Sequence, residues 1–195
     1  MFYDAVANTH GLPLDPFYAL VAPRPIAWIS TLSKAGKANL APYSFFNAFA
    51  HNPSYVAFGS SGVKNTFSNI AETSEFVVNL ATYDLREGMN VSSAATGDDE
   101  FALAGLAKAA CIKVKPPRVA ASPVSLECRH FQTVPLPDNA GQVNDYLVIG
   151  RVVGVHIDEQ FIVDGRVNTA AMRLIARLGY SEYTTVEQAW KMRRP

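Results

Sequence analysis

The chain has few cysteines, no excess charge of either sign and no long apolar run, and each absence removes a class of protein. Two cysteines, Cys111 and Cys128, in 195 residues exclude a disulfide-built scaffold and predict reduced, buried thiols in a cytoplasmic protein. Lysine plus arginine and aspartate plus glutamate each number 17, so no basic face for nucleic acid is expected. No signal peptide is read, and the longest apolar-rich stretch, 101–112, contains Lys108 and is too short to cross a bilayer.

Familiar catalytic and metal-binding motifs are absent as well. The chain has no G-x-x-x-x-G-K-[ST], no G-x-G-x-x-G and no G-x-S-x-G, which argues against a P-loop, a Rossmann site and a nucleophile elbow. The acidic run 98–100 reads as a solvated turn. No metal site is expected, because the histidines are far apart and none lies four residues from another: His10, His51, His130 and His156. For His156, a core position, a dimer contact and a place beside a cofactor stay open.

The composition and the spacing of apolar residues predict one mainly β domain. Hydrophobic residues make up 49 % and charged residues 17 % of the chain, a globular profile with an apolar surplus that a second copy of the chain would cover. No repeat or linker divides residues 1–195. Strands are expected at 26–32, 38–46, 55–59, 75–81, 124–134, 146–157 and 160–163, and helices at 66–73, 85–95 (ending near Gly97), 102–109 and 168–176. Because turns join most strands, an antiparallel, Greek-key-like barrel with added helices is favoured.

The loop 60–66 is the first candidate binding element. Ser60, Ser61 and Thr66 offer hydroxyl donors, Lys64 offers positive charge, and Asn65 is the expected N-cap of the following helix. A helix N-terminus attracts anions, so these residues suit a phosphate group. An ordinary capped helix after a polar loop would have the same composition.

The segment 39–46 is the second candidate. Pro42 lacks an N–H, which predicts an edge strand or a bulge whose free backbone groups could meet the polar edge of a planar ring. Asn39 and Ser44 add side-chain donors, and Tyr43 begins a group of aromatic residues. Packing of an edge strand against the core is the alternative. Because no catalytic side chain stands out, the pattern fits a protein whose bound cofactor performs the chemistry.

Several ordered motifs together resemble those of the flavin reductase-like, FMN-binding split-barrel family, in its flavoredoxin-type branch. The resemblance covers the chain from Leu20 to Tyr183. The motifs are RPIAWIST at 24–31, Gly36, NLAPYSFF at 39–46, Pro53, KNT at 64–66, Asn69-Ile70, EFVVN at 75–79, GRVVGVH at 150–156, ARLG at 176–179, and Tyr183.

This resemblance implies a split-barrel homodimer with FMN near the subunit interface, held tightly or used as a substrate. The flavin ring would lie against Ser30, Thr31 and the strand 39–44, which includes Ala41, Pro42, Tyr43 and Ser44. The phosphate would meet Ser60, Ser61, Lys64 and Thr66, and Arg177 would reach the site, from the same or the partner subunit. The implied reaction is hydride transfer from NADH or NADPH to the flavin N5, which needs no protein nucleophile.

One departure and three alternatives accompany this interpretation. The family often has Arg-Leu-Gly-Gly where this chain has Arg177-Leu-Gly-Tyr180, so Tyr180 would either cover the flavin or lie outside the site. The protein could instead be an electron carrier like flavoredoxin, or a reductase of another small acceptor. A third reading is a non-catalytic split-barrel binding domain. A flavin-dependent monooxygenase or another redox protein is the expected partner, with no nucleic acid and no membrane.

Overall fold

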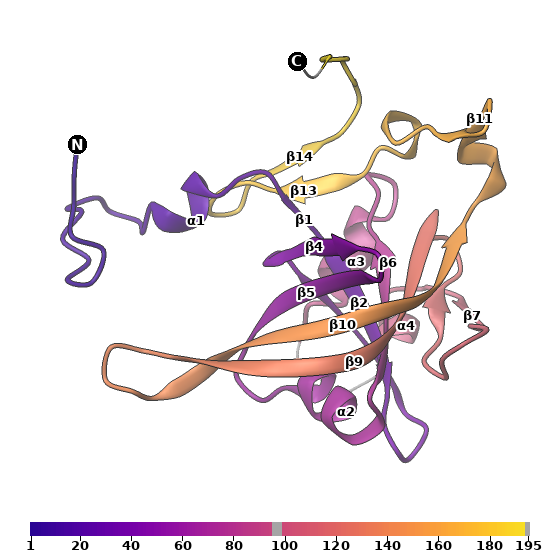
Figure 1. Ribbon diagram of the computed structural model, residues 1–195, viewed down its shortest axis with the longest axis horizontal. Coiled ribbons are helices and arrows are strands. Elements are labelled where there is room, and N and C mark those ends of the chain that lie inside the picture. The colour runs from indigo at the N-terminus through magenta and orange to yellow at the C-terminus, as the bar shows by residue number, and fades with distance from the viewer. Residues whose placement is uncertain (95–98, 194–195) are drawn as a thin grey trace.

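A seven-stranded antiparallel sheet forms the body of the molecule in the computed structural model, which describes residues 1–94 and 99–193 (Figure 1). Neighbouring strands of this sheet run antiparallel throughout, so the expected mainly β fold is confirmed. Across the sheet the order is β3 (Ala38–Tyr43), β2 (Ala27–Leu32), β6 (Glu75–Leu80), β9 (Val124–Pro137), β10 (Val143–Ile157), β5 (Ser54–Ser61) and β4 (Phe46–His51).

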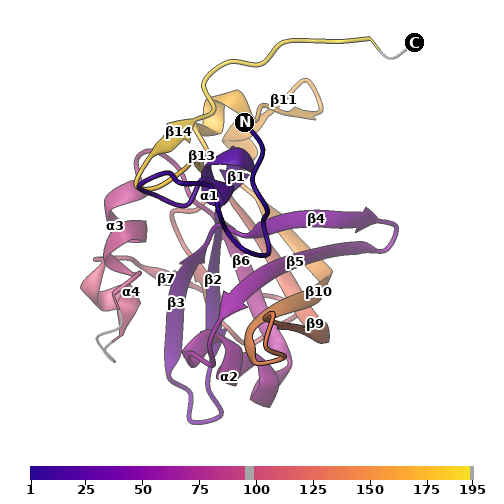
Figure 2. The same cartoon turned by 90° about the vertical axis from the view of Figure 1, so that its left-hand side faces the viewer.

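The two edge strands of this sheet, β3 and β4, are consecutive in the chain and are separated only by Ser44 and Phe45. The edges must therefore meet at this bend, where the Gly59 N–H donates to the Phe45 carbonyl at 2.8 Å. Away from the bend β3 has no strand partner besides β2 within the described residues. Helix α2 (Asn65–Thr73) lies at the end of the sheet opposite the bend (Figure 2). The result is a split barrel, closed at one end and open along β3.

The alternation of side chains along β2 separates two apolar cores. Ala27 and Ile29 face the barrel interior and pack with Phe58 and Phe76. Trp28, between them, points the other way into a second core with Leu40, Met89, Phe101 and Val119. Period-2 alternation on a sheet covered on both faces produces this division, because successive side chains leave opposite faces.

Shorter elements surround the barrel. Helices α3 (Arg86–Val91) and α4 (Glu100–Leu103) lie beside β3 (Figure 2). The small sheets are β1 (Arg24–Pro25) with β13 (Ile175–Arg177) and β14 (Tyr183–Thr185), β7 (Lys108–Ala109) with β8 (Arg118–Val119), and β11 (Ile162–Val163) with β12 (Arg166–Val167). The remaining helices are α1 (Phe17–Leu20) and the short 3-10 turns η1 (Glu159–Phe161) and η2 (Ala170–Met172). None of the helices described is long and apolar enough to span a membrane.

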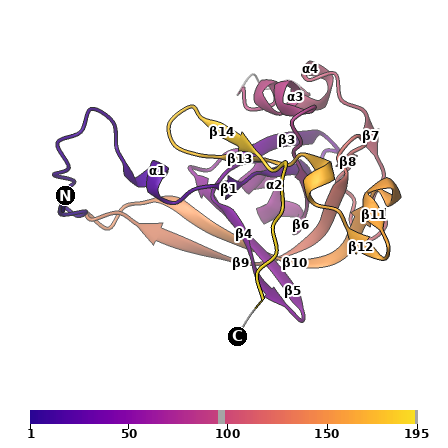
Figure 3. The ribbon, with the colours of Figure 1, turned by 90° about the horizontal axis from the view of Figure 1, so that it is seen from above.

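Three segments project from this body. The N-terminal residues extend to the tip of the long β9–β10 hairpin (Figures 1 and 3), where the Asn139 side chain donates to the Val6 carbonyl at 3.4 Å. The C-terminal residues 186–193 run away from the barrel without helix or strand. Their exposed apolar side chains, Trp190 and Met192 among them, have no covering element in the part of the chain described.

Five predicted elements differ from the structure. The expected strand 160–163 begins as the 3-10 turn η1, and only Ile162–Val163 is a strand. The expected strand 38–46 is two strands with a bend at 44–45. The expected helix 85–95 is shorter, and its predicted end near Gly97 lies outside the described residues. The helix expected at 102–109 starts and ends earlier, because Gly105 adopts a positive φ of 65° and the chain continues into β7. The helix expected at 168–176 is one 3-10 turn followed by β13, since Arg173 adopts a left-handed φ of 51°.

Candidate functional site

A pocket of about 330 Å³ opens along the unpaired side of β3. Its volume lies in the range of about 300–1,000 Å³ typical of small-molecule sites. Three regions supply its wall: β3, the start of α2, and the segments around α3 and α4. The lining residues are Asn39, Leu40, Ala41, Tyr43, Lys64, Asn65, Thr66, Ser92, Ser93, Ala94 and Glu100.

The N-terminus of α2 presents free N–H groups to this pocket. Lys64 is the N-cap, with an extended backbone, and no side chain caps the helix. The prediction that Asn65 caps the helix is therefore wrong, because Asn65 is the first helical residue. The first N–H groups of a helix have no partner within it, and the first turn of α2 holds no acidic residue. Together with Lys64 this end of the helix is a favourable place for an anion.

A hydrogen-bond network fixes the polar groups behind the pocket. The Asn39 side-chain amide donates to Thr66 Oγ1 at 2.8 Å. The Tyr43 hydroxyl forms hydrogen bonds with the side chains of Thr66 and Ser60, while burial raises the Tyr43 pKa above its ordinary value. Tyr43 therefore stays protonated and works as a fixed hydroxyl. The network ties β3 to α2 and β5 at one point.

The outer edge of β3 meets the carboxylate of Glu100. Glu100 is buried, and its Oε2 accepts a hydrogen bond from the Leu40 N–H at 3.3 Å. The prediction of a solvated turn at 98–100 is wrong for this residue, whereas Asp99 is half exposed and caps α4; Asp98 lies outside the described residues. Since the N–H of Leu40 points away from β2, a regular strand directs position 42 the same way. Pro42 thus removes no ladder bond, and the predicted edge strand is confirmed.

Two predicted ring-binding residues, Ser30 and Thr31, lie buried on β2 and do not line the pocket. Ser30 Oγ donates to the Pro117 carbonyl at 2.5 Å and accepts from the Asn79 amide at 3.2 Å. Thr31 Oγ1 accepts from the Asn69 amide of α2 at 3.0 Å. Both hydroxyls are engaged inside the protein, where they help to fix the strand behind β3.

The remaining predicted residues lie around the pocket or away from it. Ser60 is buried beneath it, beside Tyr43, and Ser44 lies in the bend between β3 and β4. Ser61 donates to the carboxylate of Asp145 on β10. Arg177 lies on β13, where its guanidinium donates to the Tyr183 hydroxyl and the Tyr180 carbonyl. Within one subunit the structure therefore gathers Asn39, Ala41, Tyr43, Lys64, Asn65 and Thr66, and leaves the others outside the pocket wall.

The sequence interpretation missed the third wall, formed by residues 92–94 and Glu100. Ser92 is brought there by the indole of Trp28, whose Nε1 donates to Ser92 Oγ at 2.8 Å. This contact joins positions 64 residues apart, and no local pattern indicates it. The buried Trp28 is the only signal, since a buried indole N–H needs a partner.

Tyr180, the departure from the family pattern, adopts a left-handed backbone with φ 54° and is 45 % exposed. Such a conformation favours glycine, and it lies in the turn between β13 and β14 rather than at the pocket. The neighbouring Gly179 is required by packing, because a Cβ there would lie 2.5 Å from the Ala19 Cβ of α1.

An apolar groove of about 430 Å³ lies beside the other edge strand, β4. We call it the β4 groove. Phe49 is 67 % exposed and Phe45 is 43 % exposed in its wall. The other lining residues are Phe17, Val21, Pro23, Arg24, Pro25, Phe46, Asn47, Ala57, Gly59, Leu136 and Leu147.

The fold and site together define a split-barrel domain with a pocket at its open edge, and comparison with known proteins identifies the family. The model of the flavin reductase like domain matches residues 20–169. An uncharacterized protein from Deinococcus radiodurans is 36 % identical over 207 residues, covering 98 % of this chain and 88 % of the relative.

Two solved structures extend this similarity. Nitrilotriacetate monooxygenase component B from Bacillus cereus is 27 % identical with a TM-score of 0.87, and 98 % of each chain is covered. The 2-nitrobenzoate 2-nitroreductase NbaA from Pseudomonas fluorescens is 26 % identical with a TM-score of 0.81, covering 91 % of this chain and 88 % of the other. The chain belongs to the flavin reductase-like family. This membership supports a flavin-related redox function and confirms the resemblance read from the motifs.

Proposed function

We propose that this protein is an FMN-binding oxidoreductase that transfers hydride from NADH or NADPH to flavin. The observation that supports it most is the uncapped N-terminus of α2 beside Lys64 and Thr66, at a pocket whose other wall is an edge strand. The first feature suits a phosphate, and the second suits the hydrogen-bonding rim of a planar ring.

The residues present fit this cofactor in two parts. Lys64, the N–H groups of Asn65 and Thr66, and the Thr66 hydroxyl would hold the phosphate. The strand 39–43 would hold the ring, with Tyr43 and Asn39 fixed by their own network. Bound flavin supplies the hydride chemistry, while the protein supplies binding and orientation. Because Ser61 is engaged with Asp145 and Ser60 with Tyr43, their proposed phosphate contacts are secondary to those of Lys64 and Thr66.

The proposed functional unit is a homodimer. The β4 groove supports this proposal, since contiguous exposed apolar residues beside an edge strand are typical of a surface that another subunit covers. Arg177 does not line the pocket of its own subunit, so its proposed contact with the cofactor would cross to the partner.

A second candidate keeps the flavin and changes the acceptor. The name of NbaA, 26 % identical to this chain, describes a nitroreductase, and the name of the Bacillus cereus relative describes a monooxygenase component. Reduced flavin passed to a monooxygenase, and a small acceptor reduced at the pocket, are therefore the two outcomes to separate. An electron carrier reduced by another protein is the third.

Titration with FMN and with riboflavin tests the site. The Lys64→Ala and Thr66→Ala variants should bind FMN about 10- to 100-fold more weakly, the loss of one or two charge-assisted contacts. Lys64→Ala should bind riboflavin as the wild type does, because riboflavin has no phosphate, whereas Thr66→Ala, which also removes the partner of the Asn39 amide, should weaken riboflavin too, but less than FMN. Lys34→Ala, in an exposed turn, is the matched control and should change neither affinity. Equal weakening for both ligands would overturn the assignment of the phosphate site.

Anaerobic stopped-flow mixing of the flavin-loaded protein with NADH and with NADPH tests the reaction. A reductase should bleach the flavin absorbance rapidly with one or both nicotinamides, in a process that saturates with nicotinamide concentration. Slow bleaching with both, together with rapid reduction by a redox protein, would favour the carrier. Protein that binds no flavin would exclude all three candidates and leave the non-catalytic binding domain.

A further inference from the structure

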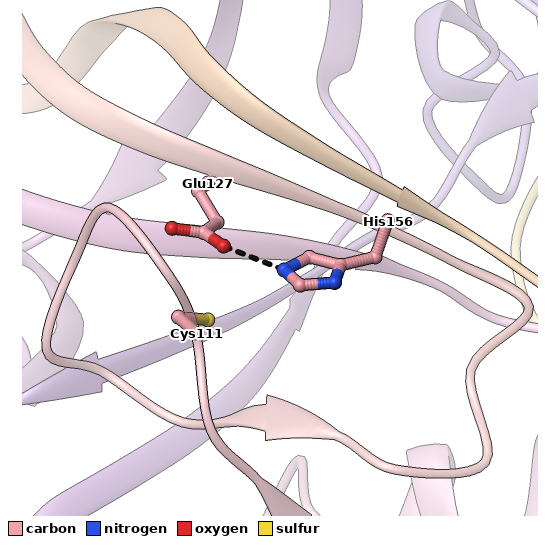
Figure 4. A group of neighbouring side chains, drawn as sticks. All are labelled: Cys111, Glu127 and His156. Carbon is pink, nitrogen blue, oxygen red and sulfur yellow. Dashed lines mark hydrogen bonds and ion pairs between the residues drawn. The ribbon is translucent and has the colours of Figure 1, made fainter.

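Three side chains from distant positions in the sequence converge beneath the loop 110–118 (Figure 4). Cys111 follows β7, Glu127 lies on β9 and His156 lies on β10. The cysteine sulfur, a carboxylate oxygen and an imidazole nitrogen all lie within 4.8 Å of one another. Sequence spacing gave no sign of this cluster, because 45 residues of chain separate its ends and the fold alone assembles it.

The carboxylate at the centre of this cluster is buried and held by the backbone. Glu127 is 1 % exposed. Its Oε2 accepts from the N–H groups of Lys113 at 2.5 Å and Val114 at 3.0 Å, and its Oε1 accepts from that of Ile112 at 2.8 Å. These bonds fix the orientation of the carboxylate in the way that outer hydrogen bonds fix metal-ligating groups.

The other two members of the cluster, His156 and Cys111, lie beside this carboxylate. His156 Nε2 lies 2.5 Å from Glu127 Oε1, and the imidazole side chain is 22 % exposed, so a solvent ion can reach it. Burial and the neighbouring Glu127 carboxylate raise the pKa of the Cys111 thiol to about 11, while the backbone N–H of Arg118 donates a hydrogen bond to the sulfur, so an incoming metal has to displace the thiol proton. The space beside the carboxylate is kept by Gly154, where a Cβ would lie 3.2 Å from the Glu127 carboxyl carbon.

We propose that Cys111, Glu127 and His156 form a binding site for a borderline-soft divalent transition metal of the Zn²⁺ class, with water as the fourth ligand. One thiolate, one imidazole and one carboxylate are the ligand types that Zn²⁺ takes in proteins, and three protein ligands leave a solvent position. Hard cations such as Mg²⁺ require oxygen ligands and are not expected. Binding displaces the thiol proton to solvent and forms the metal–sulfur bond, with no change of oxidation state.

The geometry sets a definite requirement on the histidine. Two ligand atoms at about 2.05 Å from one tetrahedral metal are about 3.3 Å apart, whereas Nε2 and Oε1 are 2.5 Å apart in this structure. The imidazole must therefore withdraw by about 0.8 Å as the metal enters and replaces the direct hydrogen bond. The Ile112 N–H occupies one lone pair of Glu127 Oε1, so withdrawal of the imidazole frees the second lone pair for the metal.

Such a metal would clamp the loop 110–118 to the sheet. The loop is already tied there by Glu127 and by Ser30, whose hydroxyl donates to the Pro117 carbonyl. A bond from Cys111 through the metal to β9 and β10 adds a third tie. The site is separate from the flavin pocket, because none of its three ligands lines that pocket.

Titration of the full-length, untagged protein with Co²⁺ under a phosphine reductant tests the site. Co²⁺ replaces Zn²⁺ in such sites and reports sulfur ligation as a charge-transfer band in the near ultraviolet. Wild-type protein should develop this band to one equivalent and lose it when Zn²⁺ is added. Cys111→Ser should remove the band, and His156→Ala should weaken binding of both metals at least about 10-fold.

The controls separate this site from adventitious binding and from unfolding. His130→Ala removes a histidine of β9 that lies outside the cluster and should leave the band intact. Cys128→Ala should keep the band as long as circular dichroism shows a folded protein. The flavin affinity of Cys111→Ser should equal that of the wild type, so a failed metal site and a failed flavin site give different results. A wild-type protein without the near-ultraviolet band, or a band that survives Cys111→Ser, would overturn the proposal.

Discussion

The two edges of the seven-stranded sheet are built in opposite ways. At the β3 edge, polar groups are paired with one another, and two helices and a buried carboxylate cover the strand. At the β4 edge, five of the six residues are exposed, and phenylalanines point into an open groove. A fixed polar wall suits a small ligand, whereas an open apolar edge suits another protein surface. The same sheet therefore provides a proposed ligand site and a proposed subunit contact, joined by the bend at 44–45.

The largest effect is expected from charge placed on the β4 edge. Phe49→Asp puts a carboxylate in the wall of the β4 groove, where burial in an interface would leave it unpaired. Self-association should weaken at least about 30-fold, the loss expected for a central aromatic contact of about 2 kcal/mol. Sedimentation velocity over a range of concentrations measures it.

Val155→Asp provides the control for this substitution. Val155 is 56 % exposed on β10 and does not line the β4 groove, so its variant should associate as the wild type does. If Phe49→Asp leaves the association state unchanged, or if the wild type is monomeric, the contrast between the two edges loses its functional meaning.

The next effect tests the β3 edge. Thr66→Val keeps the shape of the side chain and removes the hydroxyl that accepts from Asn39 at 2.8 Å. The buried Asn39 amide would then lack this partner, which should lower the free energy of unfolding by about 1–3 kcal/mol. Thr73→Val, near the other end of α2, is the matched control and should cost less, because Thr73 is only partly buried. Urea denaturation measures both, and equal losses would argue against a special role for the β3 network.

The sequence predicts those parts of the two edges that depend on residues close together in the chain. The β2–β3 hairpin, helix α2 and the edge position of Pro42 follow from alternation, helix periodicity and the missing proline N–H. The bend at 44–45 does not, because the apolar run continues through it, and only the closure of the sheet separates β3 from β4. The wall formed by Ser92 and Glu100 depends on contacts across 60 or more residues, with Trp28 and Leu40 respectively. The groups around Glu127 lie 13 to 29 residues from it in the chain, which is also beyond the reach of a local pattern.

A smaller effect is expected in the turn between β13 and β14, which packs on α1. Tyr180 adopts φ 54°, a conformation that costs a non-glycine residue about 1 kcal/mol. Tyr180→Gly should therefore raise the free energy of unfolding by up to about 1 kcal/mol, with no change in flavin affinity if Tyr180 lies outside the site. Gly179→Ala should act in the opposite direction, because its Cβ would collide with Ala19. A loss of flavin affinity in Tyr180→Gly would instead place this tyrosine over the cofactor.

The smallest effect concerns α4, which helps to cover the β3 edge. Lys108 forms a hydrogen bond with Asp99 at 2.5 Å and holds the pKa of that carboxyl below its ordinary value. Because the Asp99 pKa is lower in the folded protein than in the unfolded chain, this interaction stabilises the fold at pH values above the unfolded-state pKa of about 3.9. The stabilisation is lost as the pH falls through the folded-state pKa. Asp99→Asn keeps an N-cap oxygen and removes the charge. Because both side chains are about 40 % exposed, the loss at pH 7 should be about 0.5 kcal/mol or less.

A double-mutant cycle with Lys108→Gln isolates this interaction. The coupling energy between the two positions should be measurable at pH 7 in low salt, and should shrink in high salt because exposed charges are screened. It should also disappear in acid, once the Asp99 carboxyl of the wild type is protonated. If the coupling persisted unchanged in acid, it would come from packing rather than charge. The attachment of α4 beside the β3 edge would then be independent of pH, as contacts at the apolar β4 edge are expected to be. The two edges would no longer differ in electrostatic stabilisation.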